Sequence, residues 1–232
     1  MKMKKILFQT IAVFFAIVFS GYAALSQDLQ SARNLTNSER FEEASTAFKT
    51  LIQKENKNAD AYFYYAENFL KQYLSDTFAI SKTEVIQDIV ELYKKGIAAD
   101  STNALNYVGL GIVELLRRGD TAKADIFFNK ANGLVPVKAK KCLPKDIVVL
   151  TKLGTAQIYG KNKRHAKGLA YIDRAKEAAL DKDPEVYLAA GDIYLDKKDG
   201  SNAITNYNKA LYIDPKSALS QIKIGYIYLS AK

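Results

Sequence analysis

The sequence predicts an all-α protein in which antiparallel helix pairs stack into a solenoid, and three observations support this prediction. Only 4 of the 232 residues are Pro, while Ala, Leu, Lys and Glu are plentiful, a balance that favours helix over strand. Hydrophobic residues make up 48% of the chain, enough to bury a core. Small residues recur with a period close to 34 positions, as from Gly191 to Gly225, and such a period indicates stacked helical repeats.

The first 26 residues predict a secretory signal peptide. Three lysines lie within the first five residues, residues 11–19 are continuously apolar, and small residues follow, which is the three-part layout of an export signal. The small residues of this stretch allow cleavage either after Ser26 or after Ala23. The alternative is an uncleaved anchor, for which the apolar stretch is marginal in length. Under either interpretation the rest of the chain is expected outside the cytoplasm, in the periplasm or at the outer membrane of a bacterial envelope.

The clearest repeat covers residues 184–217. Its predicted first helix carries Gly191, and its predicted second helix carries Ala203 and Ala210 on either side of the large Tyr207. Small side chains at these places let two antiparallel helices approach closely, and the ring fills the space beside them.

Two short signals are predicted to end and reverse the helices of this repeat. Asp214 precedes Pro215, and the residue before a proline is driven out of helical geometry, which ends the second helix. Asp199 and Gly200 are predicted to form the tight turn between the two helices.

This pattern resembles the tetratricopeptide repeat, and weaker copies of it cover most of the chain after residue 26. The resemblance implies a right-handed superhelical solenoid of about five and a half repeats over residues 27–232. The alternative is an irregular helical bundle. Residues 139–148 are predicted as a link, and an excess at residues 73–84 is predicted to extend a helix or to contact a partner. The predicted units are residues 25–58, 59–103, 104–138, 149–182 and 184–217, with an incomplete unit at 218–232.

The resemblance also assigns roles to individual positions. The residues expected to pack the helices of the repeats together are Ala44, Ala66, Gly111, Ala124, Ala131, Ala156, Gly168, Ala175, Gly191, Ala203, Ala210, Pro215 and Gly225. First helices are expected to line a concave groove that binds protein segments. The residues expected to line the groove are Phe63, Glu67, Leu70, Val108, Ile112, Leu153, Gln157, Leu188, Asp192 and Leu195.

No pattern in the sequence indicates catalysis, a cofactor or a metal. The only His, His165, lies in a basic turn without a second His or Cys at ligand spacing. The only Cys, Cys142, excludes an internal disulfide and has no surroundings that suggest a nucleophile. The protein is therefore predicted not to be an enzyme.

The charge of the chain is mildly basic. The formal net charge is +9, which is weak evidence for nucleic acid, and no nucleic-acid partner is expected. Basic residues gather at 138–145 and at 161–167. They are interpreted as solvated loop charge, and the alternative is a site for an anionic partner.

The last segment, residues 218–232, is apolar nearly all round, whereas a terminal helix should present a polar outer face. The sequence therefore predicts that this helix continues into further repeats, docks on a partner or pairs with another copy. The predicted function is an extracytoplasmic scaffold that binds partner proteins of unknown identity. The alternative is an accessory or assembly subunit of an envelope enzyme or secretion complex.

Overall fold

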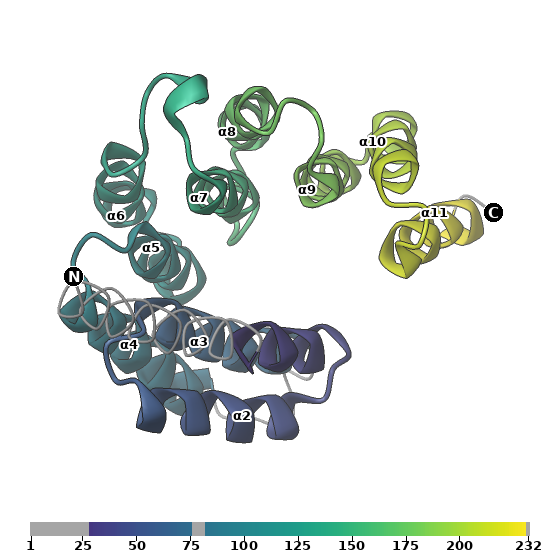
Figure 1. Cartoon of the computed structure of the whole chain (residues 1–232). Coiled ribbons are helices and arrows are strands. Elements are labelled where there is room, and N and C mark those ends of the chain that lie inside the picture. The colour runs from purple at the N-terminus through teal and green to yellow at the C-terminus, as the bar shows by residue number, and fades with distance from the viewer. Residues whose placement is uncertain (1–27, 76–81, 231–232) are drawn as a thin grey trace, which may run out of the picture. The chain divides into compact units, whose positions relative to one another are not determined.

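The computed structural model describes residues 28–75 and 82–230, and the predicted signal peptide lies outside them. Every regular element within these two ranges is helical, which confirms the prediction of an all-α fold built from helix pairs (Figure 1). The chain divides into two compact units, residues 1–100 and residues 101–232, and each is described by itself.

The first unit contains four described helices. They are a helix at residues 28–37, α2 (Phe41–Lys54), α3 (Ala59–Ser75) and α4 (Lys82–Ala99). Its core is aromatic: the Phe48 and Tyr65 rings stack with centroids 5.8 Å apart, and the Phe63 and Tyr93 rings are tilted at the same separation. Of the predicted excess at residues 73–84, the ends continue α3 and begin α4, and residues 76–81 lie outside the described ranges.

A hydrogen-bonded asparagine ties together three helices of this unit. Asn68 on α3 is fully buried, and its Nδ2 donates to Phe41 O and to Ser45 Oγ at 3.0 Å, both on α2. Its Oδ1 accepts from the Thr36 hydroxyl at 2.7 Å. Because every strong polar atom of this side chain has a partner, its burial is compatible with a stable core.

The described part of the second unit, residues 101–230, contains seven helices and one 3₁₀ turn. They are α5 (Ala104–Arg118), α6 (Thr121–Gly133), η1 (Ala139–Lys141), α7 (Pro144–Ala156), α8 (His165–Ala178), α9 (Pro184–Asp196), α10 (Gly200–Ile213) and α11 (Ala218–Ser230).

Short polar side chains set where several of these helices begin. Asp120 accepts from the backbone N–H of Lys123 at 2.9 Å, ahead of α6, and Asp199 accepts from that of Asn202 at 3.1 Å, ahead of α10. Such caps satisfy amide groups that have no partner inside the helix. At the other end of α10, Asp214 is extended, as expected for the residue before Pro215.

The turn between α9 and α10 differs from its prediction. Gly200 is the first residue of α10, and the left-handed conformation is adopted by Lys198, with φ 63°. The corresponding turn between α5 and α6 places Gly119 in that conformation, with φ 66°. The sequence misplaced the turn by two residues because the Asp–Gly pair serves here as cap and first helical residue.

The fourth repeat begins earlier than predicted. α7 starts at Pro144, inside the stretch interpreted as a link, and not at Val149. Proline suits the first helical position because it needs no backbone hydrogen-bond partner there. The buried Asp146 accepts from the backbone N–H of Leu143 at 2.7 Å and completes the helix start.

The helices of the second unit are arranged in two rows. α5, α7, α9 and α11 lie along one side of this unit in Figure 1, and α6, α8 and α10 lie along the other. α5 contacts α7 and α7 contacts α9, and each of these first helices also packs on the second helix that follows it. The first helices therefore form a row of their own. Within the two described ranges, no helix is long and apolar enough to cross a membrane.

Candidate protein-binding surface

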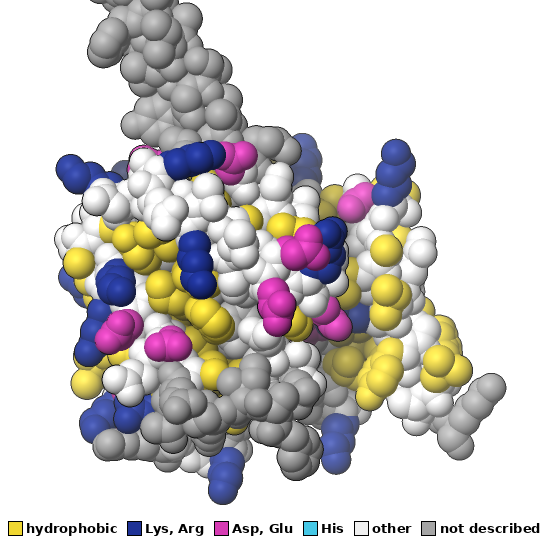
Figure 2. Space-filling view, turned by 90° about the horizontal axis from the view of Figure 1, so that it is seen from below, with side chains coloured by type: hydrophobic (Ala, Val, Ile, Leu, Met, Phe, Trp, Pro, Cys, Tyr) yellow, Lys and Arg dark blue, Asp and Glu magenta, His cyan; other side chains and the backbone are white. Residues whose placement is uncertain are grey.

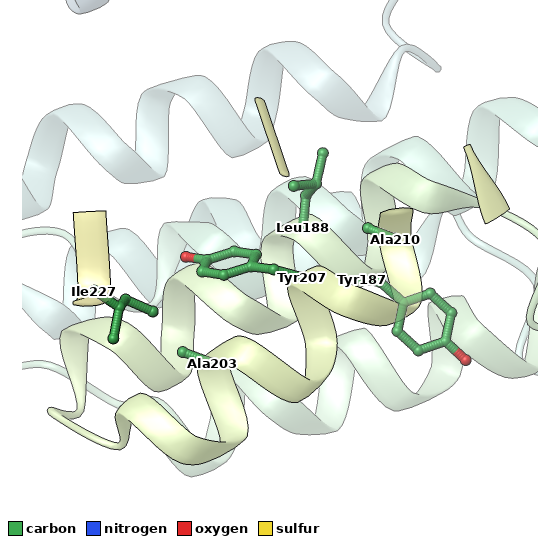
Figure 3. Packing of buried hydrophobic residues seen from close by; sticks show 6 residues of the cluster. All are labelled: Tyr187, Leu188, Ala203, Tyr207, Ala210 and Ile227. Carbon is green, nitrogen blue, oxygen red and sulfur yellow. The ribbon is translucent and has the colours of Figure 1, made fainter. Parts of the chain in front are cut away.

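In the helix pairs of the second unit, a large side chain of one helix lies directly over a glycine of the other. A Cβ atom added to Gly191 on α9 would stand 2.2 Å from Tyr207 Cε1 on α10, and one added to Gly111 on α5 would stand 2.3 Å from Phe128 Cε1 on α6. Real Cβ atoms do not approach carbon so closely, so only glycine fits beneath either ring. Figure 3 shows the buried cluster around Tyr207, which comprises Tyr187, Leu188, Ala203, Tyr207, Ala210 and Ile227.

The fourth repeat uses a glycine that the sequence pattern missed. A Cβ atom on Gly154 would stand 2.7 Å from Ile172 Cδ1 on α8, and one on Gly168 would stand 2.8 Å from Gly154 O. The two helix backbones are therefore close at this point. The repeat pattern predicts Ala156, two positions later, as the small residue of α7. Ala156 is also fully buried, but Gly154 is the residue that Ile172 covers.

Most of the predicted packing residues lie in the interior. The buried ones are Ala44, Ala66, Gly111, Ala124, Ala131, Ala156, Gly168, Ala175, Gly191, Ala203 and Ala210. Two predicted positions differ. Pro215 is exposed and acts through the backbone by ending α10. Gly225 is not a packing residue within the described chain, because no atom lies within 4 Å of a Cβ added there.

The predicted groove residues fall into two groups. Seven are buried and cannot contact a partner without a rearrangement of the core, which corrects the prediction for them: Phe63, Leu70, Val108, Ile112, Leu153, Gln157 and Leu188. Three are half-buried and remain predicted contacts: Glu67, Asp192 and Leu195.

The register of α7 explains two of these corrections. The prediction that Leu153 and Gln157 face the groove depends on Ala156 being the small residue of α7. With Gly154 in that role, the corresponding positions are Thr151 and Thr155, both half-buried. Their hydroxyls donate to backbone carbonyls of α7, Thr151 to Ile147 O at 2.8 Å. This face of α7 is therefore polar and uncharged.

Asp192 on α9 is already paired within the chain. Its Oδ1 accepts from the Tyr207 hydroxyl at 2.7 Å and from Lys223 Nζ of α11 at 2.6 Å. Burial raises the pKa of Tyr207 far above its usual value, and the neighbouring Asp192 carboxylate raises it further. Tyr207 therefore stays a hydrogen-bond donor, and the charge of Asp192 is engaged within the chain.

The basic residues at 161–167 join neighbouring repeats, so their interpretation as solvated loop charge is wrong for most of them. Asp125 on α6 accepts from Arg164 at 2.7 Å and from Lys167 at 2.8 Å. Burial alone would raise the pKa of Asp125, but the hydrogen bonds from Lys167 and Arg164 outweigh it and hold the pKa below its usual value. This carboxylate is therefore charged at neutral pH.

Asp196 on α9 forms a second link of the same kind. It pairs with Lys163 and with His165 Nε2, the latter at 2.7 Å. Burial alone would raise the pKa of Asp196, but the hydrogen bonds from Lys163 and His165 outweigh it and lower the pKa. The only histidine thus belongs to a contact between repeats, and it is half-buried at the start of α8.

Other candidate chemistry is sparse in the described residues. Cys142 is half-buried, and burial, together with the Asp146 carboxylate, raises the pKa of its thiol, which makes it a poor nucleophile at neutral pH. Within residues 28–75 and 82–230, no group of three or more His, Cys, Asp or Glu side chains could hold a metal ion.

Comparisons with known proteins point to one fold. Residues 191–231 match the family model described as "TPR repeat". The chain aligns with the crystal structure of TTC0263, a thermophilic TPR protein of Thermus thermophilus, with a TM-score of 0.60 and 20% identity, over 88% of this chain and 99% of that chain. A sequence search among curated proteins gives no match.

Two further structural alignments have lower scores. PilW, described as a widely conserved type IV pilus biogenesis factor, aligns with a TM-score of 0.48 and 17% identity over 88% of this chain and 86% of its own. YrrB, a TPR protein with an unusual peptide-binding site, aligns with a TM-score of 0.41 and 17% identity over 84% and 88%. The helix pairs and the alignment with TTC0263 together show that this chain has the fold of a tetratricopeptide repeat protein, with a repeat matched at residues 191–231.

Proposed function

We propose that this protein is an exported, non-enzymatic scaffold that binds protein partners along the row of its first helices. The observation that carries the proposal is the contact of α5 with α7 and of α7 with α9. A continuous row of helices offers one extended surface, and repeat proteins use such surfaces for binding.

The side chains of this row favour a partner segment with little charge. Thr151 and Thr155 are polar and half-buried, and Leu195 adds a half-buried apolar group. The Asp192 carboxylate is occupied by Tyr207 and Lys223. Affinity for a partner would therefore come from several modest contacts spread along the row.

Export is the second part of the proposal and rests on the predicted signal peptide at residues 1–26. Its basic start, apolar core and small residues match the layout of a secretory signal. Fractionation of cells expressing the full chain tests it directly. Recovery in the extracytoplasmic fraction supports export, and recovery in the cytoplasmic fraction alone contradicts it.

Partner binding is tested by affinity capture of the tagged full chain from an envelope extract. Thr155→Lys places a charge on the first-helix row, and Thr205→Lys places the same charge on an exposed position of α10. We expect several-fold less recovered partner with Thr155→Lys and no change with Thr205→Lys. Equal recovery by both variants would contradict binding along the row. Recovery of one stable complex in place of a set of clients would favour an accessory subunit.

A further inference from the structure

α11 presents an apolar stripe to solvent on the side away from α10. Its inner side packs on α10 through Ile224 and the buried Ile227. The outer stripe contains no charged residue, and its large side chains are 49% to 73% exposed. Figure 2 shows hydrophobic side chains gathered there, at the right edge where Figure 1 places α11. The stripe, as set by helical periodicity, consists of Ala218, Leu219, Ile222, Gly225, Tyr226 and Leu229.

This stripe corresponds to the side of α9 that α10 covers. Gly225 follows Gly191 by one repeat period of 34 residues. Gly191 lies beneath Tyr207, whereas a Cβ atom on Gly225 would meet nothing within 4 Å. Leu188 is 5% exposed, and its counterpart Ile222 is 66% exposed. Within the described residues, α11 therefore has the surface for a second helix without the helix itself.

The covered pairs show what kind of helix fits such a surface. Because α9 and α10 are antiparallel, the contact of Gly191 with Tyr207 places Leu195 opposite Ala203. Ala203 belongs to the cluster around Tyr207, and Leu195 packs against that cluster. Each glycine or alanine thus faces a large side chain. The fourth repeat shows that isoleucine can take the place of the aromatic ring, since Ile172 covers Gly154.

We propose that α11 pairs in antiparallel orientation with α11 of a second copy of this chain. Ile222 of each copy then fills the space over Gly225 of the other, as Ile172 fills the space over Gly154. The same register places Leu229 of each copy opposite Ala218 of the other. One helix therefore supplies both halves of the contact, and the pair closes about a two-fold axis, as an isologous dimer requires.

Charge and size are consistent with a weak dimer. Like residues approach one another near a two-fold axis, and the stripe carries no charge that would be repelled by its copy. α11 has 13 residues, so the contact is smaller than the standard interface of about 800 Å² per partner. The dimer is therefore expected to dissociate on dilution.

The test uses two complementary variants of the full chain. Gly225→Leu fills the space that receives Ile222, and Ile222→Ala removes the side chain that fills it. Each variant alone is expected to weaken self-association by about tenfold or more, because the defect occurs twice in a symmetric dimer. In an equimolar mixture, the leucine introduced in one copy meets the alanine introduced in the other, and the native Ile222 meets the native Gly225 at the second contact. Association is therefore expected to recover in the mixture.

Matched controls lie elsewhere on the chain. Ile126→Ala changes an isoleucine on α6 that is 67% exposed, and Gly133→Leu changes a glycine of α6 with no neighbour within 4 Å. Both controls are expected to associate like the unmodified chain. Sedimentation equilibrium measures the homodimers, and co-capture of differently tagged copies measures the mixture.

The outcomes separate this proposal from its rivals. Loss of association in each variant with recovery in the mixture supports it. Three results would each overturn it: the unmodified chain is monomeric, neither variant changes association, or the mixture does not recover. If α11 instead binds a helix of a different protein, at least one of these results is expected. The proposal goes beyond binding along the first-helix row, and Thr155→Lys leaves it untouched, so the two can fail separately.

Discussion

Tyr207 of α10 lies directly over Gly191 of α9, so closely that a single added carbon on the glycine would stand 2.2 Å from the ring. The pair combines a steric fit with a polar anchor, because the hydroxyl at the far end of the ring donates to Asp192 at 2.7 Å. Phe128 over Gly111 gives the same fit without the anchor, and Ile112 follows that glycine where Asp192 follows Gly191. The residue after the glycine is thus a hydrogen-bond acceptor where the ring carries a hydroxyl, and it is apolar where the ring does not.

Replacement of Asp125 by asparagine is expected to destabilise the chain in a pH-dependent way. The pKa of Asp125 is lowered in the folded state, so the carboxylate stabilises the fold above its unfolded pKa of about 4 and loses this effect as the pH falls through the lower folded pKa. Because the ion pairs with Arg164 and Lys167 are partly solvent-exposed, the expected loss at pH 7 is about 0.5–2 kcal/mol.

Equilibrium denaturation of Asp125→Asn and the unmodified chain between pH 7 and pH 3 checks this expectation. The two stabilities should converge towards the acid end. Asp173→Asn, at an exposed aspartate of the neighbouring α8, serves as the control and should stay close to the unmodified chain. A constant difference across the whole pH range would show that the ion pairs are not its source.

Replacement of Asn68 by alanine is expected to cost about 1–3 kcal/mol, because it removes the hydrogen bonds that its buried amide makes to two neighbouring helices. The groups concerned are Phe41 O and the Thr36 hydroxyl, which contact the Asn68 amide. Asn208→Ala changes an exposed asparagine of α10 and is expected to have little effect. Thermal unfolding followed by circular dichroism gives the comparison, and equal melting temperatures would rule out a stabilising role for the buried amide.

Replacement of Lys198 by glycine is expected to stabilise the chain by up to about 1 kcal/mol. Lys198 adopts a left-handed conformation, with φ 63°, and this conformation is less favourable for a residue with a side chain than for glycine. The neighbouring Lys197 has φ −71°, so Lys197→Gly should instead destabilise by a similar amount through the added freedom of the unfolded chain. Denaturant midpoints of the two variants should therefore move in opposite directions, and a shift in the same direction would contradict this account of the turn.

The repeat itself could be predicted from the sequence because its signals are local and periodic. Gly191, Ala203, Tyr207 and Ala210 stand at spacings that two antiparallel helices require, and all four are buried. The weaker fourth repeat offered two small residues, Gly154 and Ala156, and spacing alone favoured the wrong one. Only the approach of Ile172 to Gly154 in three dimensions distinguishes them.

The contacts between repeats could not be predicted from local patterns. Asp125 and Arg164 are 39 residues apart, and Asp196 and His165 are 31 apart, so nothing in the surrounding residues identifies them as partners. The prediction of the groove residues was wrong for most of them for a related reason. Whether a first-helix side chain faces solvent or the next helix depends on the packing of neighbouring repeats, and Val108 and Ile112 face the interior.

At the repeat position shared by Gly191 and Gly225, glycine is required where a large side chain of the next helix lies over it, and it is not required where none does. Equilibrium denaturation of dilute Gly191→Ala and Gly225→Ala tests this claim most directly, because the two glycines occupy equivalent places in successive repeats. Gly191→Ala is predicted to lose about 1–3 kcal/mol through overpacking against Tyr207. Gly225→Ala is predicted to be unchanged or up to about 1 kcal/mol more stable, since alanine is the better helix former. Equal destabilisation of the two variants would contradict the claim.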